Sequence, residues 1–394
     1  VRPSGHPYDR KTTFTPEQFR WIAALRSHDA EFLVVDEGPG MSGSSFLSVG
    51  DALIEAGVER RRIRFVCSHE PDPDNLAAPD AAQRWRAFRA ERISHRIPQL
   101  PDQAKEDCSG GEWRRWLYAS EGNWPASWTH MERAKFLSSE RRQIFKFLGH
   151  GRFGNTVAER ARLLSETGFG PKLMGIAGGF AEYRVMQGRP AEATDLSCAV
   201  VERIADYCAL RAVEFREQRG RSNLAEMVRF NFGQLMNGDV PELLQCDESG
   251  PAVICDGRMV PHEWILSDGG AVKTDGESHG DDHFFPGPCD IAWDLAGAAV
   301  EWNMDEEATD ALLRRYQLRS GDDARSRLQS YRLAYAVFRA AYCSMAAYAM
   351  RGTAEEARLQ RDVLRYKKII SGTRFESDSE PSQVPALIPI SESA

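Results

Sequence analysis

The first ninety residues contain apolar runs of two kinds, and together they predict a strand, a helix and a second strand. Residues 31–35 (EFLVV) form a short apolar run rich in β-branched residues, as a buried strand should. Residues 46–58 (FLSVGDALIEAGV) have helical spacing and end at Gly57, a residue type that commonly ends helices. Residues 62–68 (RIRFVCS) are a second apolar run. This order is a βαβ unit, which favours a parallel sheet.

The pattern changes along the rest of the chain. Residues 70–128 are rich in Pro, Asp, Arg and Trp and weakly periodic, which predicts a linker with some helix. Two apolar runs within 131–148 predict a β-hairpin, and 157–168 predict an amphipathic helix. Helices are predicted for about 192–236 and again for 290–371, on either side of a segment rich in strands and turns.

We therefore expect a multi-domain chain of the α/β and α+β classes. The expected parts are a first module over residues 1–95, a linker over 96–128 and a second domain over 129–372. The second domain divides into a smaller part over about 129–190 and a larger part over about 191–372. The last residues, 373–394, are polar and contain Pro, which predicts a disordered tail.

Composition and charge exclude several classes of protein. The 394 residues are 42% apolar, 27% charged and 10% aromatic, which is typical of a globular protein. Fifty Lys and Arg against fifty-eight Asp and Glu give a net charge of −8, which argues against nucleic acid as a partner. No apolar run approaches the roughly 20 residues that cross a bilayer, so we expect no membrane association.

The cysteines and the start of the chain bear on its location. None of the eight Cys forms a C-x-x-C pair, which argues against a zinc ribbon and predicts reduced thiols in a cytoplasmic protein. The opening VRPSGHPYDR lacks the features of a signal peptide. Its first residue is Val, which leaves open an upstream segment or a start codon other than ATG.

The loop after the first predicted strand has the composition of an anion site. Two acids end the strand, small residues follow, and the loop leads into a helix. Glycine lets the backbone approach an anion closely, and the amides of a helix N-terminus bind phosphate. A Gly/Ser turn without a ligand is the alternative. The candidate residues are Asp36, Glu37, Ser42, Gly43, Ser44 and Ser45.

This segment resembles the phosphoribosyl-diphosphate loop of type I phosphoribosyltransferases, in which four apolar residues, two acids and a spacer precede Ser/Thr-Gly-x-Ser/Thr. The matching pieces are 32–35, 36–37 and 42–45, with a spacer one residue longer than usual. The resemblance covers only about residues 14–90, the second half of such a domain. It implies a partial phosphoribosyltransferase-like module that binds phosphoribosyl diphosphate.

A second candidate site begins in the predicted hairpin. Gly149-x-Gly151-x-x-Gly154 follows a strand and precedes a helix. Lys146 lies in that strand and Glu159 in that helix, and a strand Lys paired with a helix Glu is how kinases hold nucleotide phosphates. A dinucleotide-binding loop is the alternative, although the following segment predicts a hairpin rather than a parallel strand.

The order of elements over about 125–350 resembles aminoglycoside phosphotransferases and choline-kinase-like enzymes. Residues 290–297 (DIAWDLAG) are close to the family's Asp-x-x-Tyr-Asp-Leu-Ala segment, with Trp293 in place of Tyr. The resemblance implies a two-lobed protein-kinase-like domain in which Asp294 supports the catalytic loop. It also implies that Asp275, at the end of AVKTD, binds the metal.

The same resemblance supplies candidates for the catalytic loop. Residues 255–266 (CDGRMVPHEWIL) stand in the place of the family's His-Gly-Asp-x-His-x-x-x-Asn loop but depart from that motif. Asp256 is the candidate catalytic residue. His262 is the candidate for the second metal-binding position, and Glu263 competes with it.

Residues 279–288 (HGDDHFFPGP) offer an alternative catalytic loop, because they begin with His-Gly-Asp-x-His. Too few residues then remain before DIAWDLAG for the metal-binding strand, so we favour the first assignment. The loop could instead bind substrate or metal, or be a hydrated acidic loop. The residues concerned are His279, Asp281, Asp282 and His283.

The sequence thus predicts an enzyme that uses Mg²⁺ to transfer the γ-phosphoryl group of ATP to a hydroxyl group of a small molecule, such as a sugar or a ribose-containing compound. Two alternatives stay open. One is a phosphoribosyltransferase with a non-catalytic kinase-like domain, and the other is a pseudokinase-like module that binds nucleotide without turnover.

Overall fold

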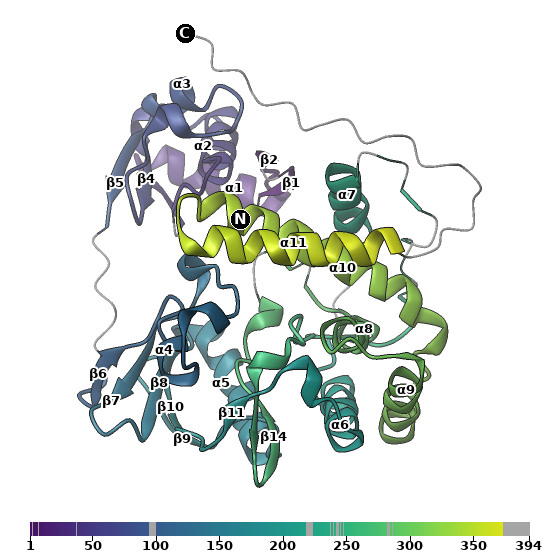
Figure 1. The fold of residues 1–394 in the computed structure, drawn as a ribbon. Helices are drawn as coiled ribbons and strands as arrows, with labels where there is room; N and C mark the ends of the chain where they lie inside the picture. Colours follow the sequence, from purple (N-terminus) through teal and green to yellow (C-terminus); the bar gives the residue numbers. More distant parts are fainter. Residues whose placement is uncertain are drawn as a thin grey trace. The chain divides into compact units, whose positions relative to one another are not determined.

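The computed structural model divides the chain into two compact units, Val1–Gln99 and Leu100–Ala394 (Figure 1). It describes residues 1–372 except 2, 7, 37, 94–99, 218–223, 237, 239, 242, 243, 245, 247, 282, 283 and 286. The tail predicted for residues 373–394 therefore lies outside the described residues.

The first unit contains a parallel sheet with the strand order β3-β4-β5. Helix α2 (Ser44–Glu55) connects β3 (Phe32–Val35) to β4 (Ile63–Cys67), which confirms the predicted βαβ unit. Strand β5 (Arg89–Arg92) lies in the segment that the sequence predicted as a linker with some helix. Its sequence RAER has no apolar alternation, and its parallel pairing with β4 identifies it as a strand.

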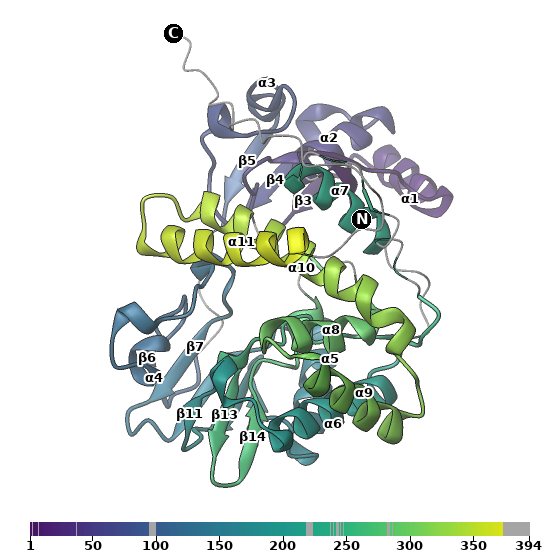
Figure 2. The ribbon, with the colours of Figure 1, turned by 45° about the vertical axis from the view of Figure 1, so that its right-hand side comes forward.

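Aromatic side chains form the core of the first unit. Phe46 of α2, Phe65 of β4 and Trp85 are buried together, with ring centroids 5.1–5.6 Å apart. The apolar face of α2 thus packs on the sheet, because its buried side chains share one cluster with those of β3 and β4. Figure 2 shows the ribbon of α2 beside these strands. The remaining elements of this unit are β1 (Ser4–His6), β2 (Asp9–Lys11), α1 (Pro16–Ser27) and α3 (Ala81–Arg86).

The second unit begins with an antiparallel sheet in the order β6-β7-β8-β10-β9. The predicted hairpin is confirmed as β7 (Lys135–Ser138) and β8 (Gln143–Phe147). The other strands are β6 (Ala104–Asp107), β9 (Leu173–Ala177) and β10 (Phe180–Arg184). Helix α5 (Gly151–Glu166) buries Val157 and Ala161 in one cluster with side chains of this sheet.

The expected linker over residues 96–128 needs correction, because part of it is integral to the second unit. Strand β6 pairs with β7, and α4 (Arg114–Leu117) places Arg114 in a buried ion pair with Glu355, at 2.8 Å. The two partners are far apart in sequence, so the local pattern carries no sign of this contact.

Helices make up most of the remaining part of the second unit, as the sequence predicted. Figures 1 and 2 show α10 (Arg325–Ala349) and α11 (Ala354–Gly372) side by side. No described helix combines the length and apolarity needed to cross a bilayer. The other helices are α6 (Cys198–Glu214), α7 (Leu224–Met236), α8 (Ala292–Glu301) and α9 (Glu306–Ser320).

Short strands lie among these helices and carry the loops of the candidate site. Strand β13 (Trp264–Ser267) pairs with β14 (Gly270–Lys273) and with β11 (Arg189–Pro190). Strand β12 (Ala252–Val253) pairs with β15 (Cys289–Asp290). Paired strands therefore flank both loops of the candidate site. One loop runs from β12 to β13, and the other runs from β14 to β15.

Candidate phosphate and metal site

Two buried lysines from neighbouring strands meet one aspartate. Lys135 of β7 and Lys146 of β8 are direct partners in the antiparallel register, so their side chains lie on the same face of the sheet. Lys135 Nζ lies 3.1 Å from Asp275 Oδ2, and Lys146 Nζ lies 2.5 Å from Asp275 Oδ1. Lys146 Nζ also lies 2.5 Å from Glu277 Oε1. The arrangement brings two ammonium groups and two carboxylates together.

Charge in this group is balanced locally. Burial raises the pKa of Asp275, but the charges of Lys135 and Lys146 outweigh it and hold that pKa well below its ordinary value. Burial likewise lowers the pKa of Lys135, but Asp275 and Glu132 raise it overall. Both partners are therefore ionised at neutral pH. The Asp275 side chain keeps 24% of its exposure, so it is within reach of a ligand from solvent.

The predicted partner of Lys146 needs correction. Glu159 is exposed on α5, and no ion pair joins it to Lys146 among the described residues. The next residue, Arg160, is on the buried face of the helix, donates from Nε to the Glu277 carbonyl at 2.7 Å, and pairs with Asp281. The helical period decides this, because it places 157, 160, 161 and 164 inward and 159 outward.

The glycine loop joins β8 to α5, as predicted. Gly149 and Gly151 have φ values of +116° and +58°, in the region that favours glycine. A Cβ at Gly154 would collide with the carbonyl of Gly149, so the start of the helix lies against the loop. Gly149 thus lies in the turn directly after the strand that carries Lys146, and Gly151 begins helix α5.

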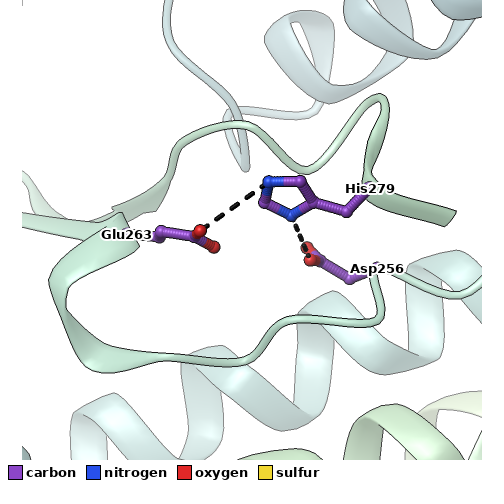
Figure 3. A group of neighbouring side chains, drawn as sticks. All are labelled: Asp256, Glu263 and His279. Atoms are coloured by element: carbon purple, nitrogen blue, oxygen red, sulfur yellow. Dashed lines mark hydrogen bonds and ion pairs between the residues drawn. The ribbon is translucent and has the colours of Figure 1, made fainter. Parts of the chain in front are cut away.

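A second polar cluster joins Asp256, Glu263 and His279 (Figure 3). The His279 ring lies between the two carboxylates, with Nδ1 3.1 Å from Asp256 Oδ1 and Nε2 3.7 Å from Glu263 Oε1. Lys273, the last residue of β14, reaches the same carboxylates. The sequence offered Asp256, Glu263 and His279 as candidates in two different loops. The fold brings the three side chains into one group.

Asp256 is fully buried and hydrogen-bonded on both oxygens. In addition to His279 at Oδ1, Oδ2 accepts a hydrogen bond from Tyr207 at 2.5 Å and lies 3.2 Å from Lys273 Nζ. Burial raises the pKa of Asp256, but Lys273, His279 and Arg211 lower it overall, so the carboxylate is ionised. The aspartate thus anchors the loop in this structure.

Asp294 fixes the backbone of the loop that contains Asp256 through two hydrogen bonds. Its carboxylate accepts the backbone N–H groups of Asp256 and Gly257 at 2.8 and 2.9 Å, which is the support that the family resemblance implied. Arg211 of α6 lies 3.6 Å from Asp294 and donates to Tyr207 and to the Gly276 carbonyl, both at 2.8 Å.

His262, the first choice for the second metal-binding position, lies outside this cluster. Its ring stacks on Trp113, with centroids 6.4 Å apart and planes 18° from parallel. Burial lowers the pKa of His262. Glu263, which competed with it, is in the cluster instead, because consecutive residues of the short helical turn before β13 point in different directions.

The described residues of the acidic loop at 279–283 have different partners. His279 belongs to the second cluster, and Asp281 pairs with Arg160. Asp282 and His283 lie outside the described residues. The sequence reasoning missed the following contributors: Lys135, Lys273, Glu277, Arg160, Tyr207 and Arg211. Lys135 had one usable signal, its position directly across the predicted hairpin from Lys146.

The loop that the sequence suggests as an anion site follows β3 and leads into α2. Asp36 directly follows β3 and is exposed, and Ser44 begins α2. Gly43 has a φ of +67° and precedes the helix, and the hydroxyls of Ser42 and Ser44 are 3.0 Å apart. Ser45 is half-buried in the first turn of the helix, and Glu37 lies outside the described residues.

No model of a known protein family and no curated protein matches the chain. Solved structures that resemble it are kinases and phosphotransferases. Choline kinase LicA from Streptococcus pneumoniae is 16% identical, with a TM-score of 0.42 over 60% of this chain and 89% of that chain. A choline/ethanolamine kinase family protein from Mesorhizobium loti is 16% identical, with a TM-score of 0.44 over 67% and 95%.

A third structure is macrolide 2'-phosphotransferase MphH from Brachybacterium faecium. It is 13% identical, with a TM-score of 0.39 over 68% of this chain and 97% of that chain. Each of these TM-scores is below 0.5, so the similarities do not assign a function to the chain.

Proposed function

We propose that the second unit is a Mg²⁺-dependent phosphotransferase that moves the γ-phosphoryl group of ATP to a hydroxyl group of a small molecule. The observation that supports this most directly is the convergence of Lys135 and Lys146 on Asp275. Phosphoryl transfer needs cations on the phosphates and carboxylates for the metal, and little else from the protein. Both kinds of group meet here beside a glycine loop.

The side chains around Asp275 are of the types that bind Mg²⁺ and the phosphates of ATP. Asp275 and Glu277 offer carboxylate oxygens, the ligands that Mg²⁺ prefers. Lys135 and Lys146 offer the charge that phosphate oxygens require. When bound, the metal would neutralise negative charge on the phosphoryl group being transferred. The lysines would exchange their carboxylate partners for phosphate oxygens, and the backbone at Gly149 and Gly151 would cover the phosphates.

In the proposed reaction, a bond forms between the acceptor oxygen and the γ-phosphorus while the bond to the β–γ bridging oxygen breaks. ADP leaves, and the proton of the acceptor hydroxyl is released to solvent. Asp256 is the proposed residue that orients the acceptor hydroxyl. Since both its oxygens are hydrogen-bonded in this structure, this role requires the hydroxyl to replace one present partner, such as His279. We propose a sugar- or ribose-containing acceptor because a candidate sugar-phosphate loop lies in the same chain.

Lys146→Ala is expected to weaken binding of MgATP by about ten- to a hundredfold, because a charge-assisted hydrogen bond contributes about 1.5–3 kcal/mol. Isothermal titration calorimetry measures the affinity. The matched control is Lys105→Ala, which removes an exposed lysine from β6 of the same sheet and should leave the affinity unchanged. Equal affinity in wild type and Lys146→Ala would exclude Lys146 from the nucleotide site.

We propose a separate anion site at the start of α2 in the first unit, supported by the Gly43 turn at the carboxyl end of a parallel strand. Phosphoribosyl diphosphate should bind there without ATP. Ser44→Ala should weaken it about tenfold, because a hydrogen bond to a charged group is lost, and Ser27→Ala on α1 is the control. Absence of calorimetric heat with phosphoribosyl diphosphate and with ribose 5-phosphate would reject this site.

A further inference from the structure

The cluster of Asp256, Glu263 and His279 has the composition of a metal site. One ligand atom from each residue lies within 4.8 Å of the others. Two carboxylates and an imidazole are a common ligand set for divalent ions. The position that such an ion would take, however, lies next to a fourth side chain, that of Lys273.

The ammonium of Lys273 is held by three oxygens in this cluster. Nζ donates hydrogen bonds to Glu263 Oε2 at 2.7 Å and to the Thr274 carbonyl at 2.9 Å. It also forms an ion pair with Asp256 Oδ2 at 3.2 Å. The side chains of Lys273 and Asp256 are both 0% exposed. Lys273 is therefore enclosed together with the carboxylates that it neutralises.

We propose that Lys273 is a built-in cation that holds Asp256 and Glu263 together at the place where a divalent ion would otherwise bind. The three-residue cluster then takes no metal in the native protein. Buried carboxylates need a nearby positive charge. Here that charge is a side chain of the protein itself, Lys273 at the end of β14. A bound ion would have to displace an ammonium that solvent cannot reach.

The contrast with Asp275 bears on where the metal of the proposed reaction would bind. The Asp275 side chain keeps 24% of its exposure, whereas that of Asp256 keeps none. A ligand from solvent can therefore exchange with the lysines at Asp275, whereas Oδ2 of Asp256 stays enclosed with Lys273. Only the Oδ1 side of Asp256, which faces the 13% exposed His279, is open to an acceptor hydroxyl. This consequence rests on the proposed function: the site takes one divalent ion with the nucleotide, and Lys273 supplies the second positive charge.

The test uses the full chain and Mn²⁺ alone, with bound ions counted by electron paramagnetic resonance. His279→Ala should bind as many Mn²⁺ ions as wild type, because His279 holds no metal in the native protein. Lys273→Met should gain one Mn²⁺ ion, because it frees Asp256, Glu263 and His279 as ligands. Adding His279→Ala to Lys273→Met should abolish that gain. Lys135→Met, which removes a buried strand lysine outside this cluster, is the control and should gain no His279-dependent ion.

Two results would overturn the proposal. One is a lower Mn²⁺ count in His279→Ala than in wild type. The other is no gain in Lys273→Met that circular dichroism shows to be folded. If Lys273→Met does not fold, the comparison of wild type with His279→Ala still decides. No nucleotide is present in this experiment, so its outcome does not depend on whether the chain transfers phosphate. Absence of MgATP binding and of turnover in the wild-type protein would reject only the proposed function.

Discussion

Asp275→Asn is expected to reduce Mg²⁺-dependent turnover of ATP by about 10²–10³-fold, the effect of removing one electrostatic stabiliser from an active site. The substitution keeps the shape of the side chain but removes the charge that faces Lys135 and Lys146. Asn also tolerates the φ of +59° at this position. Release of ADP at saturating ATP measures turnover, and calorimetry with MgATP measures the accompanying loss of metal-dependent affinity.

Asp268→Asn is the matched control, because Asp268 lies exposed in the turn between β13 and β14, and turnover should be unchanged. Asp256→Asn distinguishes the two proposed roles: it should retain MgATP affinity and lose mainly the chemical step, since an orienting group acts in the transition state. If Asp256→Asn kept full turnover and Asp281→Asn lost turnover, the catalytic loop would be residues 279–283 rather than the loop that contains Asp256.

Arg211→Met is expected to lower the free energy of unfolding by about 3–5 kcal/mol, because it leaves a buried charge without its partner. Arg211 is 1% exposed, lies 3.6 Å from Asp294, and donates to Tyr207 and to the carbonyls of Ile254 and Gly276. Urea unfolding followed by tryptophan fluorescence measures the loss.

Arg203→Met on the same helix is the control for this prediction. Arg203 is partly exposed and donates to the carbonyls of Ala271 and Gly168, with no ion pair shorter than 4 Å among the described residues. Its loss should be about 1 kcal/mol, the net contribution of ordinary hydrogen bonds. Equal destabilisation by the two substitutions would show that Arg211 acts through packing rather than through its charge.

The elements with a clear period were predictable from the sequence. The βαβ unit of β3, α2 and β4 follows from two apolar runs around a helical segment. The hairpin of β7 and β8 follows from two apolar runs and a turn. Strands β5 and β6 were not predictable, because RAER and AKED have no apolar alternation, and it is their pairing with β4 and β7 that identifies them as strands.

The sequence alone was enough to locate the segments of the candidate site: the strand with Lys146, the glycine turn after it, and the strand that ends before Asp275. It located them because strand period, turn residues and charge are local properties. Only the tertiary structure decided the pairings. Lys146 meets Asp275 and Glu277 rather than Glu159, and Lys273 lies between Asp256 and Glu263. These contacts join segments whose distance in space depends on how strands and helices pack, and no local pattern encodes that distance.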